Sequence, residues 1–123
     1  MLNNSYWNDE DAICEIRNIA RSPKLDIAYK KHALERLSER GLIMSDVLYV
    51  LKNGFIHLNP EPATRNGYNK YAMECRCPNG GSREVRVIVI PDKKACLLKI
   101  ISVMWVDEKK TRAGTIIGEE YNE

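Results

Sequence analysis

The segment KHALERLSERG, residues 31–41, has the pattern of a helix that ends at a glycine. Apolar side chains recur in it and just before it at the spacing of one helix face: Tyr29, Ala33, Leu34 and Leu37. Gly41 is typical of the left-handed residue that ends a helix, and Arg40 suits the negative end of the helix dipole. We therefore predict a helix over residues 28–40.

Two further helices are predicted on either side of this stretch. Upstream, an Asn-Asp pair at residues 8 and 9 can cap a helix over residues 9–21, and Ser22-Pro23 ends it because the residue before proline avoids the helical region. Downstream, Ser45 can cap a helix over residues 45–53, which Asn53-Gly54 stops.

The pattern changes from helical spacing to alternation after Gly54. Four strands are predicted, over residues 55–58, 68–77, 83–90 and 95–106. Residues 59–67 are rich in proline, asparagine and glycine and are predicted to be a loop, and turns are expected at residues 78–81 and 91–94. Helices followed by consecutive strands indicate an α+β fold, with the helices packed on a four-stranded antiparallel sheet.

Length and charge narrow the class of protein. The chain has 123 residues, which fits a single domain over residues 1–123. Residues 1–20 carry a net charge of −3, residues 107–123 carry −2, and the middle of the chain carries +7. A basic body suits a polyanionic partner, although a solubilising mixture of charges gives the same pattern. We expect a cytoplasmic protein with no secretory leader and no membrane partner, because no apolar run is long enough for either.

The four cysteines do not have the spacing of a zinc site. Cys75 and Cys77 form a C-x-C pair, and Cys14 and Cys96 are distant in sequence. We expect reduced, partly buried thiols, no metal and no cofactor. A metal protein or small-molecule binder that uses the C-x-C pair with His57 is a weaker alternative.

One face of the predicted helix over residues 28–40 carries groups suited to phosphodiester cleavage. His32 and Arg36 are one turn apart, Glu35 lies beside them, and Arg40 continues the row. A histidine can move a proton near neutral pH, and an arginine can stabilise charge on a pentavalent phosphorus. The alternative is a solvated helix whose charges only pair with one another.

This helix and the next resemble a small uncharacterised domain family. Residues 31–42 are similar to its hallmark "hAlERlkeRgi", residues 45–54 to its "s.edVlevLknG", and residues 99–105 to its closing strand "v.iiTvy". The resemblance covers about residues 25–106. Two departures stand out, namely Ser102 where the closing strand often has threonine, and the acidic extensions at both ends of the chain.

That family is similar to the barnase–EndoU–colicin–RelE group of RNase toxins, which includes RelE, BrnT and MqsR-like proteins. The resemblance implies a metal-independent endoribonuclease of a toxin–antitoxin system, encoded beside a small antitoxin, for example a zinc-finger protein of the MqsA type. It assigns catalysis to His32, Glu35, Arg36 and Arg40.

Candidate substrate-binding residues come from basic and aromatic positions around this motif. They are Lys31, Lys70, Tyr71, Arg86 and His57. Tyr71 shares its strand face with Met73 and can instead be a core residue, and His57 either joins His32 in an acid–base pair or is a lone surface histidine. The sequence thus leaves two functions open: an endoribonuclease, and a non-catalytic module on the same fold that binds RNA or a protein.

Overall fold

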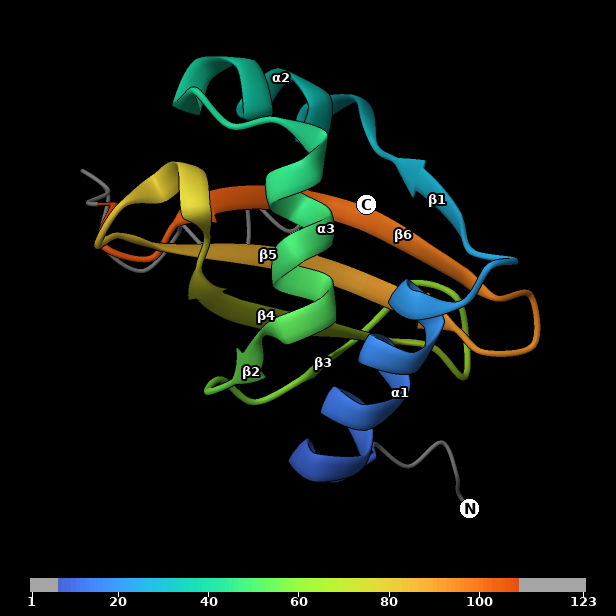
Figure 1. Ribbon diagram of the computed structural model, residues 1–123. Helices are drawn as coiled ribbons and strands as arrows, with labels where there is room; N and C mark the ends of the chain where they lie inside the picture. Colours follow the sequence, from blue (N-terminus) through green and yellow to red (C-terminus); the bar gives the residue numbers. More distant parts are fainter. Residues whose placement is uncertain (1–6, 109–123) are drawn as a thin grey trace.

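Three helices cover one face of a mixed β-sheet in the computed structural model, which describes residues 7–108 (Figure 1). The helices are α1 (Asp9–Arg21), α2 (Lys31–Arg40) and α3 (Met44–Asn53). The strands are β1 (Asp26–Tyr29), β2 (Phe55–Ile56), β3 (Glu61–Pro62), β4 (Asn69–Arg76), β5 (Glu84–Asp92) and β6 (Leu97–Trp105). The sheet order is β1-β6-β5-β4-β2, with β3 paired to β4. The α+β fold expected from the sequence is confirmed.

The helix ends follow from local hydrogen bonding. The Asn8 side chain accepts the Asp11 N–H at 2.8 Å, which caps α1 as predicted. Gly41 has φ +69° and ends α2 in the left-handed conformation. Helix α3 begins one residue earlier than expected, because Ser45 does not cap it; the Asp46 carboxylate instead accepts the Ile43 N–H at 3.0 Å.

The predicted start of the second helix at residue 28 is wrong. Residues 26–29 form β1, which runs parallel to β6 and pairs Asp26 with Leu97 and Tyr29 with Ile100. Backbone bonds to Cys96 and Ile100 continue this pairing at both ends of β1. The hydrogen bonds to a distant strand outweigh the weak local preference for helix.

The sheet has six strands and is mixed, where four antiparallel strands were expected. The three longest strands, β4, β5 and β6, form the predicted antiparallel meander. Part of the predicted loop, Glu61–Pro62, is β3, and β2 is shorter than the predicted residues 55–58. Between β4 and β5, residues Pro78–Gly80 form a short 3-10 helix instead of a tight hairpin turn. No helix within residues 7–108 is long and apolar enough to cross a membrane.

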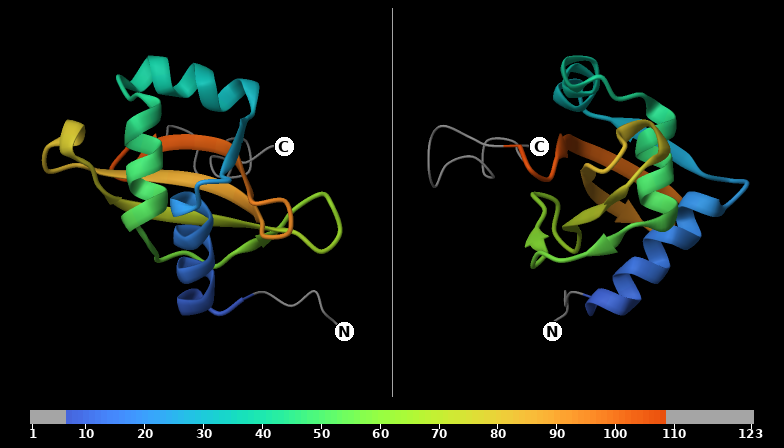
Figure 2. Two further views of the ribbon diagram at one scale, coloured as in Figure 1. Left: turned by 45° about the vertical axis from the view of Figure 1, so that its right-hand side comes forward. Right: turned by 60° about the vertical axis from the view of Figure 1, so that its left-hand side comes forward.

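The two faces of the sheet are covered differently. The helices bury the larger core, whose fully buried side chains include Ile16, Leu51 and Met73. The opposite face holds a smaller cluster around Ile88 and Ile101, covered in part by the segment over residues 58–68. The views in Figure 2 show this segment and the helices on opposite sides of the sheet.

Helix α1 is fastened to the C-terminal end of α3. Arg17 donates to the carbonyl oxygens of Asn53 at 3.0 Å and Gly54 at 2.7 Å, and Arg21 donates to the Lys52 carbonyl at 2.6 Å. These carbonyls lie at the negative end of the α3 dipole, so the two guanidinium groups both satisfy and neutralise it.

Candidate functional site

The first turn of α2 gathers positive charge on an exposed helix end. Lys30 precedes the helix without a side-chain cap, the first turn contains no acid, and Lys31 and His32 follow. The His32 side chain is 65% exposed, and its Nδ1 lies 3.4 Å from a Glu35 carboxylate oxygen. A helix N-terminus with flanking cations attracts an anion such as phosphate, and a histidine held by a carboxylate is suited to proton transfer.

The arginines further along α2 are engaged by carboxylates. Arg36 pairs with Glu39 at 3.2 Å, and its side chain is 27% exposed. Arg40 is more deeply placed and binds Glu108 through two nitrogens, one bond being 2.6 Å long. Arg36 therefore borders solvent near His32, whereas Arg40 connects the end of α2 to the segment after β6.

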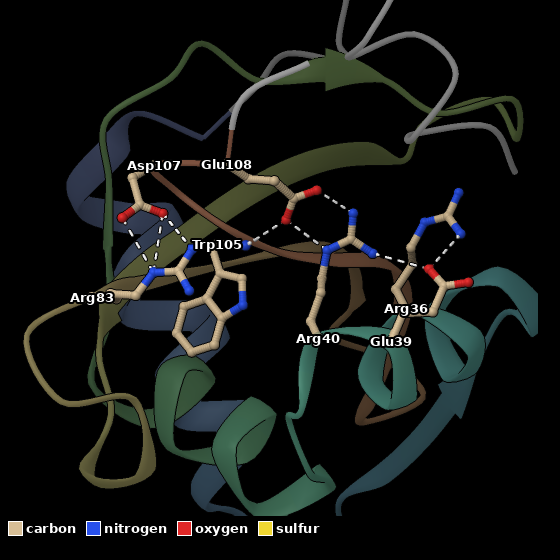
Figure 3. Close-up of polar contacts among 7 residues, drawn as sticks. All are labelled: Arg36, Glu39, Arg40, Arg83, Trp105, Asp107 and Glu108. Carbon is tan, nitrogen blue, oxygen red and sulfur yellow. Dashed lines mark hydrogen bonds and ion pairs between the residues drawn. The ribbon is translucent and has the colours of Figure 1, made fainter. Parts of the chain in front are cut away.

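We call the end of the sheet where β5 begins and β6 ends the arginine end (Figure 3). Arg83 donates to Asp107 at 2.7 Å and lies 4.1 Å above the Trp105 ring. The hydrogen bond from Arg83 is the main cause that holds the pKa of Asp107 below its ordinary value. Glu108 accepts from the Trp105 N–H at 3.2 Å as well as from Arg40. No sequence pattern predicted the pairs Arg40–Glu108 and Arg83–Asp107, because their partners are far apart along the chain.

The candidate residues of β4 and β5 lie in different surroundings. Arg86 binds Glu74 at 2.6 Å on the face opposite the helices, and Glu74 is only 4% exposed. Tyr71 is 2% exposed in the core beneath the helices and stacks on Trp7. Lys70 is partly buried and borders a pocket of about 200 Å³ with Leu58.

The structure does not bring the two histidines together. His32 follows β1, and His57 follows β2, and these strands are the opposite edges of the sheet order. Both side chains are exposed. The candidate residues that the structure does collect are those of α2: Lys31, His32, Glu35 and Arg36.

The four cysteines are free thiols, and Cys77 is buried. Burial is the main cause that raises the pKa of Cys77, and the charge and hydrogen bond of Asp46 raise it further. Asn79 also donates to this carboxylate, at 3.2 Å, so Asp46 joins the start of α3 to the 3-10 helix. Within residues 7–108, no group of three or more histidine, cysteine or acidic side chains is placed to hold a metal.

A second concave region lies at the opposite end of the sheet, where β5 ends and β6 begins, which we call the lysine end. Here a pocket of about 340 Å³ is lined by Trp7, Tyr68, Tyr71 and the turn carrying Lys93 and Lys94. This pocket was not predicted from the sequence. Its one visible signal was the alternation of aromatic and basic residues from Arg65 to Tyr71.

The comparisons with known proteins give one match, to a protein-family model. No curated protein and no solved structure matches the chain. A family model described as "Domain of unknown function (DUF4258)" matches residues 29–105, which run from the end of β1 to the end of β6 and leave α1 outside. This match covers more than half of the chain, so the protein belongs to the DUF4258 family.

Proposed function

We propose that this protein is a metal-independent endoribonuclease of a toxin–antitoxin system. The observation that carries the proposal is the His32–Glu35 pair on the first turn of α2, beside Lys30 and Lys31. These residues also belong to the motif that resembles the small uncharacterised domain family, and a similarity of that family to RNase toxins is part of this proposal. An exposed helix end with two lysines can hold an RNA phosphate next to a residue that moves protons.

The chemistry needs no metal in this proposal. The RNA 2′-oxygen attacks the adjacent phosphorus, the bond from phosphorus to the 5′-oxygen breaks, and a 2′,3′-cyclic phosphate forms. The Glu35 carboxylate lies 3.4 Å from Nδ1 of His32, which leaves Nε2 as the nitrogen proposed to take the 2′-hydroxyl proton. The departing 5′-oxygen receives a proton from the imidazolium or from water.

Arg36 is the residue proposed to stabilise the charge on phosphorus. It lies one helical turn after His32, and its partner Glu39 is 60% exposed. An ion pair with such an exposed partner contributes little stability, so a phosphate can displace Glu39. Arg40 is already bound by Glu108, so we assign it to holding α2 in position.

The test is cleavage of a synthetic single-stranded RNA by the full-length protein in the presence of a chelator. We expect fragments that end in 2′,3′-cyclic phosphate. His32→Gln should lower the rate by about 100-fold or more, because general acid–base catalysis contributes that much. Ser38→Gln, at an exposed position on the same helix, is the matched control and should keep the wild-type rate.

A folded wild-type protein that leaves the RNA intact would exclude the enzyme and favour the second candidate function. That candidate is a non-catalytic module that binds RNA or a protein partner. It is favoured by the arginines of α2, which are both paired with carboxylates. Growth of a bacterial host expressing the protein, with and without the product of a neighbouring gene, tests the toxin–antitoxin assignment separately.

A further inference from the structure

The pocket at the lysine end has the features of a nucleotide site. Its lining contains three aromatic residues and a turn with two consecutive lysines. Its volume of about 340 Å³ lies at the lower end of the range for small-molecule pockets. None of its residues belongs to the proposed cleavage site on α2.

The aromatic wall is ordered by stacking. The rings of Trp7 and Tyr71 lie 5.9 Å apart and 18° from parallel, and Tyr71 is fixed in the core. Tyr68, also in the lining, carries the Arg65 guanidinium 4.3 Å from its ring centre. Because Tyr71 is buried, it only supports Trp7, and the half-buried rings of Trp7 and Tyr68 are the flat surfaces on which a base can stack.

The Asp92 carboxylate in the pocket is suited to accept a hydrogen bond from a nucleotide base. Asp92 accepts from the Tyr68 hydroxyl and from the Ala95 N–H, both at 3.2 Å, so its carboxylate is held at the pocket wall. A carboxylate has about four acceptor positions, which leaves capacity for a base amino group.

The two lysines differ in their availability. Lys93 is paired with Glu15 of α1 at 3.1 Å. Lys94 is exposed, and no described side chain within residues 7–108 forms an ion pair with it. Lys94 is therefore the cation placed to meet a phosphate at the rim of the pocket.

We propose that this pocket binds one nucleotide of a single-stranded RNA, with the base against the aromatic wall and the phosphate at Lys94. The identification of the ligand as RNA rests on the proposed function, whereas binding of a nucleotide does not require cleavage. The pocket would add a contact away from α2 and so restrict which RNA segments the protein holds.

The two tryptophans of the chain provide the test. Trp7 lines the pocket, and Trp105 lies at the arginine end of the sheet. We expect titration with AMP, up to about 10 mM, to move the indole N–H signal of Trp7 in a nitrogen–proton NMR spectrum and to leave that of Trp105 in place. A Trp7→Phe variant assigns the two signals.

A charge reversal at the rim then locates the phosphate. Lys94→Glu should weaken AMP binding by about fivefold. Arg76→Glu is the matched control, because it makes the same change of charge at an exposed position at the other end of β4 and should leave binding unchanged. Unmoved Trp7 signals, or equal effects of both variants, would overturn the nucleotide site.

An oligonucleotide that cannot be cleaved separates this inference from the proposed function. A 2′-O-methyl tetranucleotide lacks the attacking hydroxyl, so its binding is measured without turnover. We expect wild type to bind it at least as tightly as AMP, and Lys94→Glu to weaken the binding of both ligands. If AMP binds and the oligonucleotide does not, the pocket takes free nucleotides and the RNA assignment is wrong.

Discussion

The two ends of the sheet differ in whether their basic side chains are bound by carboxylates. At the arginine end, Arg40 and Arg83 are each bound by a carboxylate from the two residues Asp107 and Glu108. At the lysine end, Lys93 is paired with Glu15, whereas Lys94 faces solvent beside a pocket. A basic side chain therefore indicates an anion-binding site only when no carboxylate already binds it. A paired arginine already donates to its carboxylate the N–H groups that a phosphate would need.

Glu74 and Arg86, near the arginine end, form the most deeply buried ion pair described within residues 7–108, and breaking it should have the largest effect. Glu74→Gln should lower the free energy of unfolding by about 3 kcal/mol, because it leaves a largely buried guanidinium without its charged partner. Urea denaturation measures the change. The double variant Glu74→Met with Arg86→Met should recover most of the loss, and an equal loss in both would show that charge burial is not the cause.

A smaller loss of stability is expected when the ion pair between Arg40 and Glu108, which joins α2 to the segment after β6, is broken. Glu108→Gln should destabilise the protein by about 2 kcal/mol, because Arg40 loses two charge-assisted hydrogen bonds in a partly buried place. Glu39→Gln on the same helix is the control, and its exposed carboxylate should matter by less than about 0.5 kcal/mol. Similar losses in the two variants would refute a special role for Glu108.

The exposed ion pair between Arg83 and Asp107 should lower the pKa of Asp107 measurably. Arg83 stabilises the charged form of Asp107, so its pKa in the folded protein lies below its ordinary value of 3.8. This pair therefore contributes stability above that value, which is lost as the pH falls through the pKa of the folded state. Carboxyl NMR should follow the shift, and Arg83→Gln should raise the pKa of Asp107. An unchanged pKa in that variant would mean that the hydrogen bond is not formed in solution.

The lysine end should show almost no contribution to stability. Lys94→Glu should change the free energy of unfolding by less than about 0.5 kcal/mol, because the side chain is exposed. A larger destabilisation, measured in the same urea experiment, would remove the contrast between the two ends and give Lys94 a structural role.

Most of the helices and of the central sheet could be predicted because their signals are local. The bounds of α1 agree with the predicted residues 9–21, and Gly41 adopts the left-handed conformation that its position indicated. β1 could not be predicted, because its pairing with β6 joins residues that the local pattern cannot connect. The short strands β2 and β3 depend in the same way on β4.

Only the part of the candidate site that lies on α2 could be predicted from the sequence. The spacing of His32, Glu35 and Arg36 places them on adjacent positions of α2, as helical geometry requires. Sequence patterns could not show that Arg40 is bound by Glu108, or that Trp7 packs on Tyr71. Both contacts arise from tertiary packing between distant segments. Of the acidic C-terminal extension over residues 107–123, only Asp107 and Glu108 belong to the described residues.

The parallel pairing of β1 with β6 has a consequence for synthesis on the ribosome. The strand that begins at Asp26 finds its partner only when the segment from Leu97 has been made. Contacts between such distant segments slow folding, and until then β1 exposes unpaired backbone groups at a strand edge. The nascent chain therefore completes its sheet only after β6 has left the ribosome, and the interval between the synthesis of β1 and that of β6 is the period when it most needs a chaperone.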